Sequence, residues 1–288
     1  MSEHLSQNGP ATPFVRPTGG ELVKRVISAV ILATIGIGAT VAGPWPLAVV
    51  VVAVSALLAW EWGRLVRNCE FDDMLFVHVA ALVIAITLAA AGEMQYALLV
   101  LVVGFVAIAI RRSKEYRKLS ALGVPYVGIA ATGIIWLRDS EQGLAAVLLI
   151  FACVWAHDSV AMLAGRAAGG PRLWPSVSPK KTWSGALAGL TASTLVAAVA
   201  TVFIPGTGVI WLCAIGFLLG LAALIGDLAE SSLKRLGRVK NASGLIPGHG
   251  GFLDRMDGAI ASFALACLIA YSINPDAPAQ ALLRGFSL

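Results

Sequence analysis

Two acidic pairs flank a basic, glycine-rich stretch in the last third of the chain. Asp227 and Glu230 lie three residues apart before this stretch, and Asp254 and Asp257 lie three residues apart after it. On a helix, each pair would share one face. Carboxylate oxygens can bind a divalent cation, and the lysines and arginines between the pairs can meet phosphate oxygens. The pattern therefore predicts a metal-dependent phosphate site at the edge of a bilayer.

The stretch between the acidic pairs adds cations, a hydroxyl group and adaptable backbone. Ser231 lies on the face that Asp227 occupies, and the glycines of PGHGG let backbone N–H groups approach an anion closely. The basic residues here are Lys234, Arg235, Arg238 and Lys240, and Arg255 lies within the second acidic pair. Because Mg²⁺ usually takes only one or two protein carboxylates beside substrate phosphate, we expect Asp227 and Asp254 to bind it.

Each part of this pattern also has a simpler interpretation. Asp227 could be a helix-end charge near water, and Asp254 and Asp257 could cap the next helix, whose positive end favours carboxylates. His249, flanked by glycines, could orient a phosphate or shuttle a proton, or it could satisfy the backbone of a turn. Two acidic clusters around one basic stretch favour the metal site over these local explanations.

A second group of polar residues lies within residues 155–185. Asp158 stands at the end of an apolar run, and Ser178, Lys181 and Thr182 precede the next one. Hydroxyl and ammonium groups beside a helix start suit an anion such as a triphosphate or a lipid phosphate. An ordinary membrane flank would explain the lysines but not Asp158.

The chain that must position these groups is too apolar for a soluble domain. Of its 288 residues, 58% are hydrophobic and 13% are charged, and the mean hydropathy is +0.83. We expect an all-α, polytopic integral membrane protein with about nine transmembrane helices. The predicted segments are 26–42, 46–62, 74–91, 95–110, 119–137, 143–157, 183–204, 208–226 and 257–273. The four scattered cysteines fit buried thiols better than a metal site.

Basic residues accumulate on alternate loops between these segments. This alternation predicts a cytoplasmic N-terminus and places the segments 155–185 and 226–258 on the same cytoplasmic side. Residues 1–22 are polar, and we expect them to form a disordered cytoplasmic tail. Residues 23–288 are expected to form a single transmembrane domain. The net charge of +5 fits the loop bias and does not call for a nucleic-acid partner.

The basic stretch and its flanks resemble the signature of the phosphatidate cytidylyltransferase family, also called CDP-diacylglycerol synthases. The matching residues are Ser231, Lys234, Arg235, Lys240, Pro247, His249, Gly250, Gly251, Asp254, Arg255 and Asp257. The segment SPKKTWSG at 178–185 is similar to a second family element, and Asp158 matches the acidic residue before it. Asn241 departs from the signature, which has Asp after Lys240. Since Asn offers a carbonyl oxygen without a charge, metal affinity or substrate preference could differ there.

The resemblance implies that CTP and phosphatidic acid give CDP-diacylglycerol and pyrophosphate with Mg²⁺, at the cytoplasmic face of a bacterial inner membrane. The implied catalytic residues are Lys234, Arg235, Lys240, His249, Arg255 and Asp257. The implied substrate-binding residues are Asp158, Ser178, Lys181, Thr182, Ser231, Gly250 and Gly251, beside the metal ligands Asp227 and Asp254. The expected partners are CTP, phosphatidic acid and membrane lipids, without nucleic acid, and the chain could form a homodimer.

Two other functions stay open at this point. A CTP-dependent transferase or kinase acting on another lipid would use similar residues, and Asn241 leaves room for it. A transporter would also carry polar residues among apolar helices, but here they gather at one face instead of near the membrane midplane. A large separation between Asp227 and Asp254 would favour the transporter.

Overall fold

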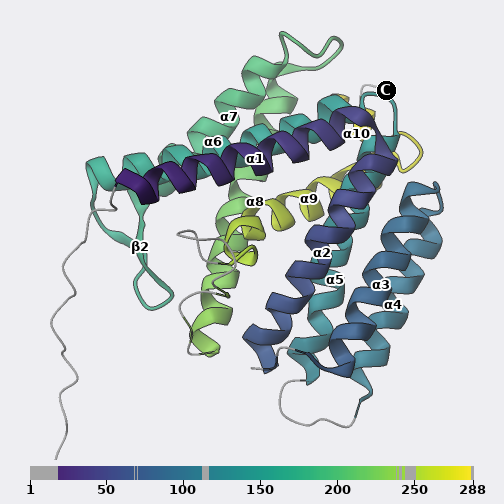
Figure 1. The fold of residues 1–288 in the computed structure, drawn as a ribbon. Helices are drawn as coiled ribbons and strands as arrows, with labels where there is room; N and C mark the ends of the chain where they lie inside the picture. The colour runs from purple at the N-terminus through teal and green to yellow at the C-terminus, as the bar shows by residue number, and fades with distance from the viewer. Residues whose placement is uncertain are drawn as a thin grey trace, which may run out of the picture.

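The structure is a computed structural model that describes residues 19–67, 69, 71–111, 117–237, 239, 242–243 and 251–286. Its elements are α1 (Gly19–Ala42), α2 (Pro44–Arg67), α3 (Asp73–Ala90), α4 (Met94–Ala109), α5 (Arg117–Asp139), α6 (Gly143–Ala168), β1 (Arg172–Trp174), β2 (Ser178–Thr182), α7 (Trp183–Ala200), α8 (Val209–Leu236), α9 (Leu253–Ile273) and α10 (Pro278–Arg284). Each helix from α1 to α9 overlaps the apolar segment predicted for it (Figure 1). Helix α1 begins at Gly19, inside the range predicted for the tail.

Seven helices of the described part are long and apolar enough to cross a membrane, namely α2, α3, α5, α6, α7, α8 and α9. Two further apolar helices are shorter there, Val30–Ala42 within α1 and Met94–Ala109. The chain is therefore an integral membrane protein, and the described residues support seven of the roughly nine predicted spans.

Helices α6 and α8 are longer than a membrane requires. They contain 26 and 28 residues, against the roughly 20 that a span needs. The apolar segments end near residues 157 and 226, but the helices continue to Ala168 and Leu236. Asp158 and Asp227 therefore lie on rigid helices that extend beyond the apolar runs.

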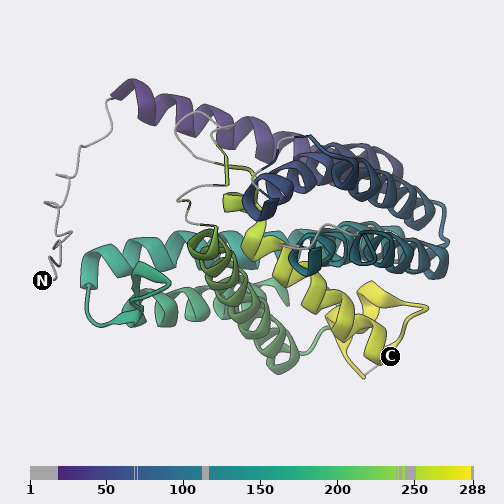
Figure 2. The same cartoon turned by 90° about the horizontal axis from the view of Figure 1, so that it is seen from below.

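The helices pack in two groups that α9 connects. In the first group, α2, α3 and α4 pack around α5; in the second, α6 and α7 pack along each other and α8 crosses them (Figures 1 and 2). Helix α9 contacts α8 on one side and α5 on the other, while α1 contacts α2 and α6. Large aliphatic side chains such as Leu82, Ile86 and Ile135 are fully buried in the first group.

Small residues let α6, α7 and α8 approach closely, as is common for packed membrane helices. A Cβ atom added at Gly220 on α8 would lie 2.2 Å from Ser193 Oγ on α7. One added at Gly189 on α7 would lie 2.9 Å from the ring of His157 on α6. Because these helices are so close, the polar ends of α6 and α8 lie near each other.

The described part of the chain is nearly all helical, as predicted, apart from one short pair of strands. Strands β1 and β2 form an antiparallel pair in which Arg172 faces Thr182 and Trp174 faces Ser178. Gly169 and Gly170 have positive φ angles and end α6, and the prolines that follow disfavour a helix. Helix α10 was not predicted either; it is buried through residues such as Leu282, whose carbonyl oxygen accepts from Trp211 Nε1 at 2.9 Å.

Candidate active site

The candidate site forms where α8 and α9 cross. A Cβ atom added at Gly226 would lie 2.5 Å from the backbone oxygen of Asp257, and one added at Gly258 would lie 3.3 Å from Ala223 Cβ. The two helices can therefore approach to backbone contact at these glycines. Since Asp227 follows Gly226 and Asp257 precedes Gly258, the crossing brings both carboxylates into one place.

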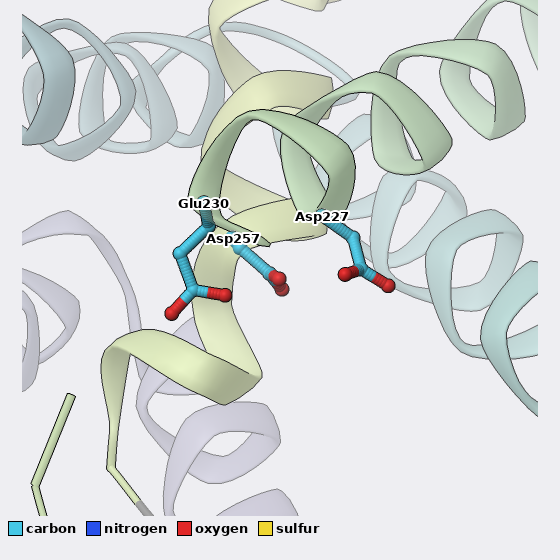
Figure 3. A group of neighbouring side chains, drawn as sticks. All are labelled: Asp227, Glu230 and Asp257. Carbon is cyan, nitrogen blue, oxygen red and sulfur yellow. The ribbon is translucent and has the colours of Figure 1, made fainter. Parts of the chain in front are cut away.

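Three carboxylates form a cluster at this crossing. One oxygen each from Asp227, Glu230 and Asp257 can be chosen so that all lie within 4.8 Å of one another. Figure 3 shows the Asp257 side chain on α9 between the two acidic side chains of α8. Glu230 and Asp257 are buried, with exposed fractions of 1% and 7%. Like charges this close repel one another, so the cluster favours a cation between them.

Asp254, the second predicted metal ligand, is engaged by Lys234 and by backbone N–H groups. Its Oδ1 accepts from Lys234 Nζ at 2.8 Å, and Lys234 also donates to Glu230 Oε2 at 3.0 Å. Its Oδ2 accepts from the backbone N–H groups of Gly251 at 2.9 Å and Ala242 at 3.3 Å. Asp254 is thus linked to the carboxylate cluster through Lys234, while its role as a metal ligand stays a prediction. Asp227 and Asp254 belong to one connected cluster, unlike what the transporter alternative predicts.

The segment 155–185 reaches the same cluster. Lys181 Nζ on β2 lies 2.5 Å from Asp227 Oδ2. Asp158 on α6 interacts electrostatically with Asp227 and Asp257, and with the opposite charge of Lys181. Arg235 Nε donates to the carbonyl oxygen of Val177 at 3.3 Å, which ties α8 to the turn between the strands. The two motif-bearing segments therefore meet in space.

The predicted hydroxyl groups have local partners in the structure. Thr182 caps α7, because its Oγ1 accepts from the N–H of Gly185 at 3.2 Å, and its exposed fraction is 5%. Ser231 Oγ donates to Asp227 Oδ1 at 3.4 Å. Ser178 lies half-buried in β2, opposite Trp174. These contacts give Thr182 a structural role whether or not it also meets a substrate.

Other predicted site residues are placed less fully. Arg255 is exposed on the first turn of α9, near enough to interact electrostatically with Asp158. Gly251 is buried at the start of α9. The residues Lys240, Asn241, His249 and Gly250 lie outside the described part of the chain.

Two acidic residues of the site were not chosen from the sequence. Glu230 shares a helix face with Asp227, so its spacing was a usable signal for the cluster. Glu61 on α2 is fully buried and accepts from the backbone N–H groups of Phe252 and Leu253. A carboxylate inside an apolar run signals a buried polar contact, but its partners lie 191 and 192 residues away in the sequence.

The fold and this cluster together define a class: a helical membrane protein with a carboxylate and ammonium site at the ends of its long helices. Residues 23–273 match the model of the cytidylyltransferase family, and the chain belongs to that family.

Three similar proteins carry the name phosphatidate cytidylyltransferase. The one from Brucella suis biovar 1 is 34% identical over 261 residues, covering 89% of this chain and 96% of that protein. The one from Staphylococcus saprophyticus is 38% identical over 138 residues, or 47% of this chain and 52% of that protein. The one from Rickettsia bellii is 37% identical over 147 residues, or 48% of this chain and 63% of that protein.

Proposed function

We propose that the chain transfers a cytidylyl group from CTP to phosphatidic acid, which gives CDP-diacylglycerol and pyrophosphate. The observation that carries this proposal is the cluster of Asp227, Glu230 and Asp257 with Lys181 and Lys234 beside it. Such a cluster suits a reaction in which several negative phosphates must be brought together. The similarity to the Brucella suis phosphatidate cytidylyltransferase over most of both chains supports the choice of substrates.

The carboxylates at the helix crossing fit Mg²⁺. Carboxylates offer oxygen atoms, the kind of ligand that Mg²⁺ prefers. These carboxylates lie on two rigid helices, α8 and α9. Asp227, Glu230 and Asp257 would hold the ion. Asp254, which accepts from Lys234, would lie beside the ion without being one of these three ligands. When bound, Mg²⁺ would neutralise phosphate charge and polarise a phosphoryl oxygen.

The basic residues complete the charge balance that the reaction needs. An oxygen of the lipid phosphate attacks the α-phosphorus of CTP. The bond between the α-phosphorus and the oxygen that bridges to the β-phosphate breaks, and pyrophosphate leaves with the electron pair of that bond. Lys181, Lys234 and Arg255 would contact the phosphates and stabilise the charge that gathers there. Both Lys181 and Lys234 now contact carboxylates, so substrate phosphates would compete for them. No covalent protein nucleophile is required.

The place of the site explains how one enzyme can serve a soluble and a membrane-bound substrate. Asp158 and Asp227 lie just beyond the apolar runs of α6 and α8. CTP can arrive there from water, and the headgroup of phosphatidic acid lies at the same depth of the bilayer. We propose that this end faces the cytoplasm of a bacterial inner membrane, with the N-terminus on the same side. The alternating loop charge supports that orientation.

The proposal is tested by following CDP-diacylglycerol formation from labelled CTP and phosphatidic acid by purified protein in detergent. We expect product with Mg²⁺ and none with a chelator. Diacylglycerol and an isoprenoid alcohol serve as alternative acceptors in parallel assays. Labelled product with one of these, and none with phosphatidic acid, would replace the proposed substrate. A gain in rate from Asn241→Asp would show that the departure from the signature weakens the enzyme.

A further inference from the structure

Glu61 is a carboxylate within the apolar helix α2, and its exposed fraction is 0%. Burial of a carboxylate is costly unless hydrogen-bond donors satisfy it. Its donors come from the other end of the sequence. Phe252 N donates to Oε1 at 2.8 Å, Leu253 N donates to Oε2 at 2.5 Å, and Ser243 Oγ also donates to Oε1.

Through these contacts Glu61, a residue of α2, caps the N-terminus of α9. Helix α9 begins at Leu253, and Phe252 at its N-cap position makes no side-chain capping hydrogen bond. The first N–H groups of a helix have no acceptor within the helix, and that end favours negative charge. Glu61 supplies both the acceptors and the charge. The start of α9 is therefore tied to α2.

The same two chain segments are bound by Asp254 of the candidate site. Asp254 Oδ2 accepts from Gly251 N and Ala242 N, whose sequence neighbours Phe252 and Ser243 bind Glu61. Two carboxylates thus bind the segments 242–243 and 251–253 together. Leu253, which donates to Glu61, directly precedes Asp254, so the contact with Glu61 lies one residue from the Asp254 side chain.

Gly251 shows how closely these segments fit. A Cβ atom at this residue would lie 2.9 Å from Glu61 Oε1 and 2.9 Å from Ser243 N. Both distances are too short for ordinary contact, so the carboxylate and the backbone leave no room for a side chain. The arrangement around Glu61 therefore needs the glycine at 251.

We propose that Glu61 is a positioning residue for the cytidylyl-transfer site. It fixes the first turn of α9, so that Asp254 holds Lys234 and Asp257 faces the acidic residues of α8. The effect on kcat rests on the proposed function, whereas the effect on the structure of α9 does not. Glu61 contacts no residue of the carboxylate cluster directly among the hydrogen bonds of the described part, so it acts through the backbone of α9.

The test compares Glu61→Gln with Glu93→Gln, which makes the same change at an exposed residue before α4. Gln has only one acceptor oxygen. Its NH2 group would therefore face one of the two backbone N–H groups that now donate to Glu61. We expect faster hydrogen exchange in peptides that contain Phe252 and Leu253. We also expect kcat to fall about 10- to 100-fold, the range typical when a residue that orients metal-site groups is changed. KM for CTP should rise by a smaller factor. Glu93→Gln should change neither.

A double-mutant cycle separates positioning from general loss of stability. If Glu61 acts through Asp254, the variant with Glu61→Gln and Asp254→Asn should lose less activity than the product of the two single losses. Should Glu61→Gln fail to fold, Ser243→Ala removes one donor and should change exchange and kcat in the same direction.

Unchanged exchange at the start of α9, or activity losses that multiply fully in the cycle, would overturn the proposal. If the unmodified protein forms no CDP-diacylglycerol, the proposed function fails. The exchange measurement still decides whether Glu61 holds α9.

Discussion

Two helix pairs of this molecule, α3 with α4 and α8 with α9, both approach closely at a glycine, but only the second pair forms a polar site. A Cβ atom at Gly104 on α4 would lie 2.7 Å from Ala81 Cβ on α3, and one at Gly226 on α8 would lie 2.5 Å from the Asp257 oxygen on α9. Valine and phenylalanine flank Gly104, whereas Asp227 follows Gly226. Close approach is general in this fold, and the residues beside the glycine decide whether a site results.

The comparison predicts different consequences for disturbing the two pairs. At the α3–α4 contact, only apolar packing is at risk, so changes there should alter stability. At the α8–α9 contact, the same disturbance also moves carboxylates that must lie within a few ångströms of one another. Changes there should reduce the rate of the folded protein.

Neutralising one carboxylate of the cluster should have the largest effect. In Asp257→Asn the side chain keeps its size but loses its charge, and we expect kcat to fall about 100- to 1,000-fold. The matched control is Asp276→Asn, which lies exposed beyond the other end of α9 and should keep full activity. Equal activity of the two variants would remove Asp257 from the site.

Crowding the two glycines tests the comparison itself. Gly226→Ala and Gly104→Ala should each cost about 1–3 kcal/mol of unfolding free energy, because both add a methyl group to a tight contact. Gly226→Ala should in addition lower kcat about tenfold or more, since misplaced catalytic groups are costly even at small displacements. Thermal unfolding and kcat of the folded fraction give the two quantities. A similar kcat in both variants would contradict the difference between the pairs.

Removing the cation that contacts Asp227 should have an intermediate effect. Hydrogen bonds to charged groups are worth about 1.5–3 kcal/mol, so Lys181→Ala should raise KM for CTP about 10- to 100-fold. Lys180→Ala is the control, because neighbouring residues of a strand point to opposite sides and Lys180 is exposed. Steady-state kinetics with varied CTP would measure both. An equal rise in both variants would indicate that only the general positive charge of the strands matters.

Removing the cap of α7 should have the smallest effect. Thr182→Ala loses the hydrogen bond from Gly185 and should cost about 1 kcal/mol of stability. KM for CTP should stay unchanged if capping is the whole role of Thr182, and Thr182→Ser should restore the stability. A raised KM in Thr182→Ala that Thr182→Ser reverses would support the substrate contact predicted from the sequence.

Most helix positions could be predicted because long apolar runs in a membrane chain have few alternatives to helix. The strand pair β1–β2 could not, since its register depends on how the chain turns after Gly170. The lengths of α6 and α8 beyond their apolar runs were also missed, because hydropathy marks the membrane and not the end of a helix. Asp158 and Asp227 were singled out from the sequence because they stand at the ends of those apolar runs.

Spacing predicted which carboxylates could meet but not which way each one points. Asp227 and Asp254 were chosen as metal ligands from the sequence, one from each predicted helix, and Glu230 was left out. In the structure, Lys234 and the backbone of Gly251 engage Asp254, while Glu230 lies beside Asp257. Spacing on α8 placed Glu230 beside Asp227, but which carboxylate of α9 meets them depends on how α8 and α9 cross. Glu61 was not chosen as a site residue because its hydrogen-bond partners are distant in the sequence.

The metal site at the crossing of α8 and α9 is tested most directly by Mn²⁺ binding to the purified protein in detergent without nucleotide, measured by electron paramagnetic resonance. Mn²⁺ accepts the same oxygen ligands as Mg²⁺ and can replace it as a probe. We expect the unmodified protein to bind Mn²⁺ and Mg²⁺ to displace it. Asp257→Asn and Asp227→Asn should lose this binding, and Asp276→Asn should retain it. Undiminished binding in Asp257→Asn and Asp227→Asn would contradict the assignment of the α8–α9 carboxylates as the metal site.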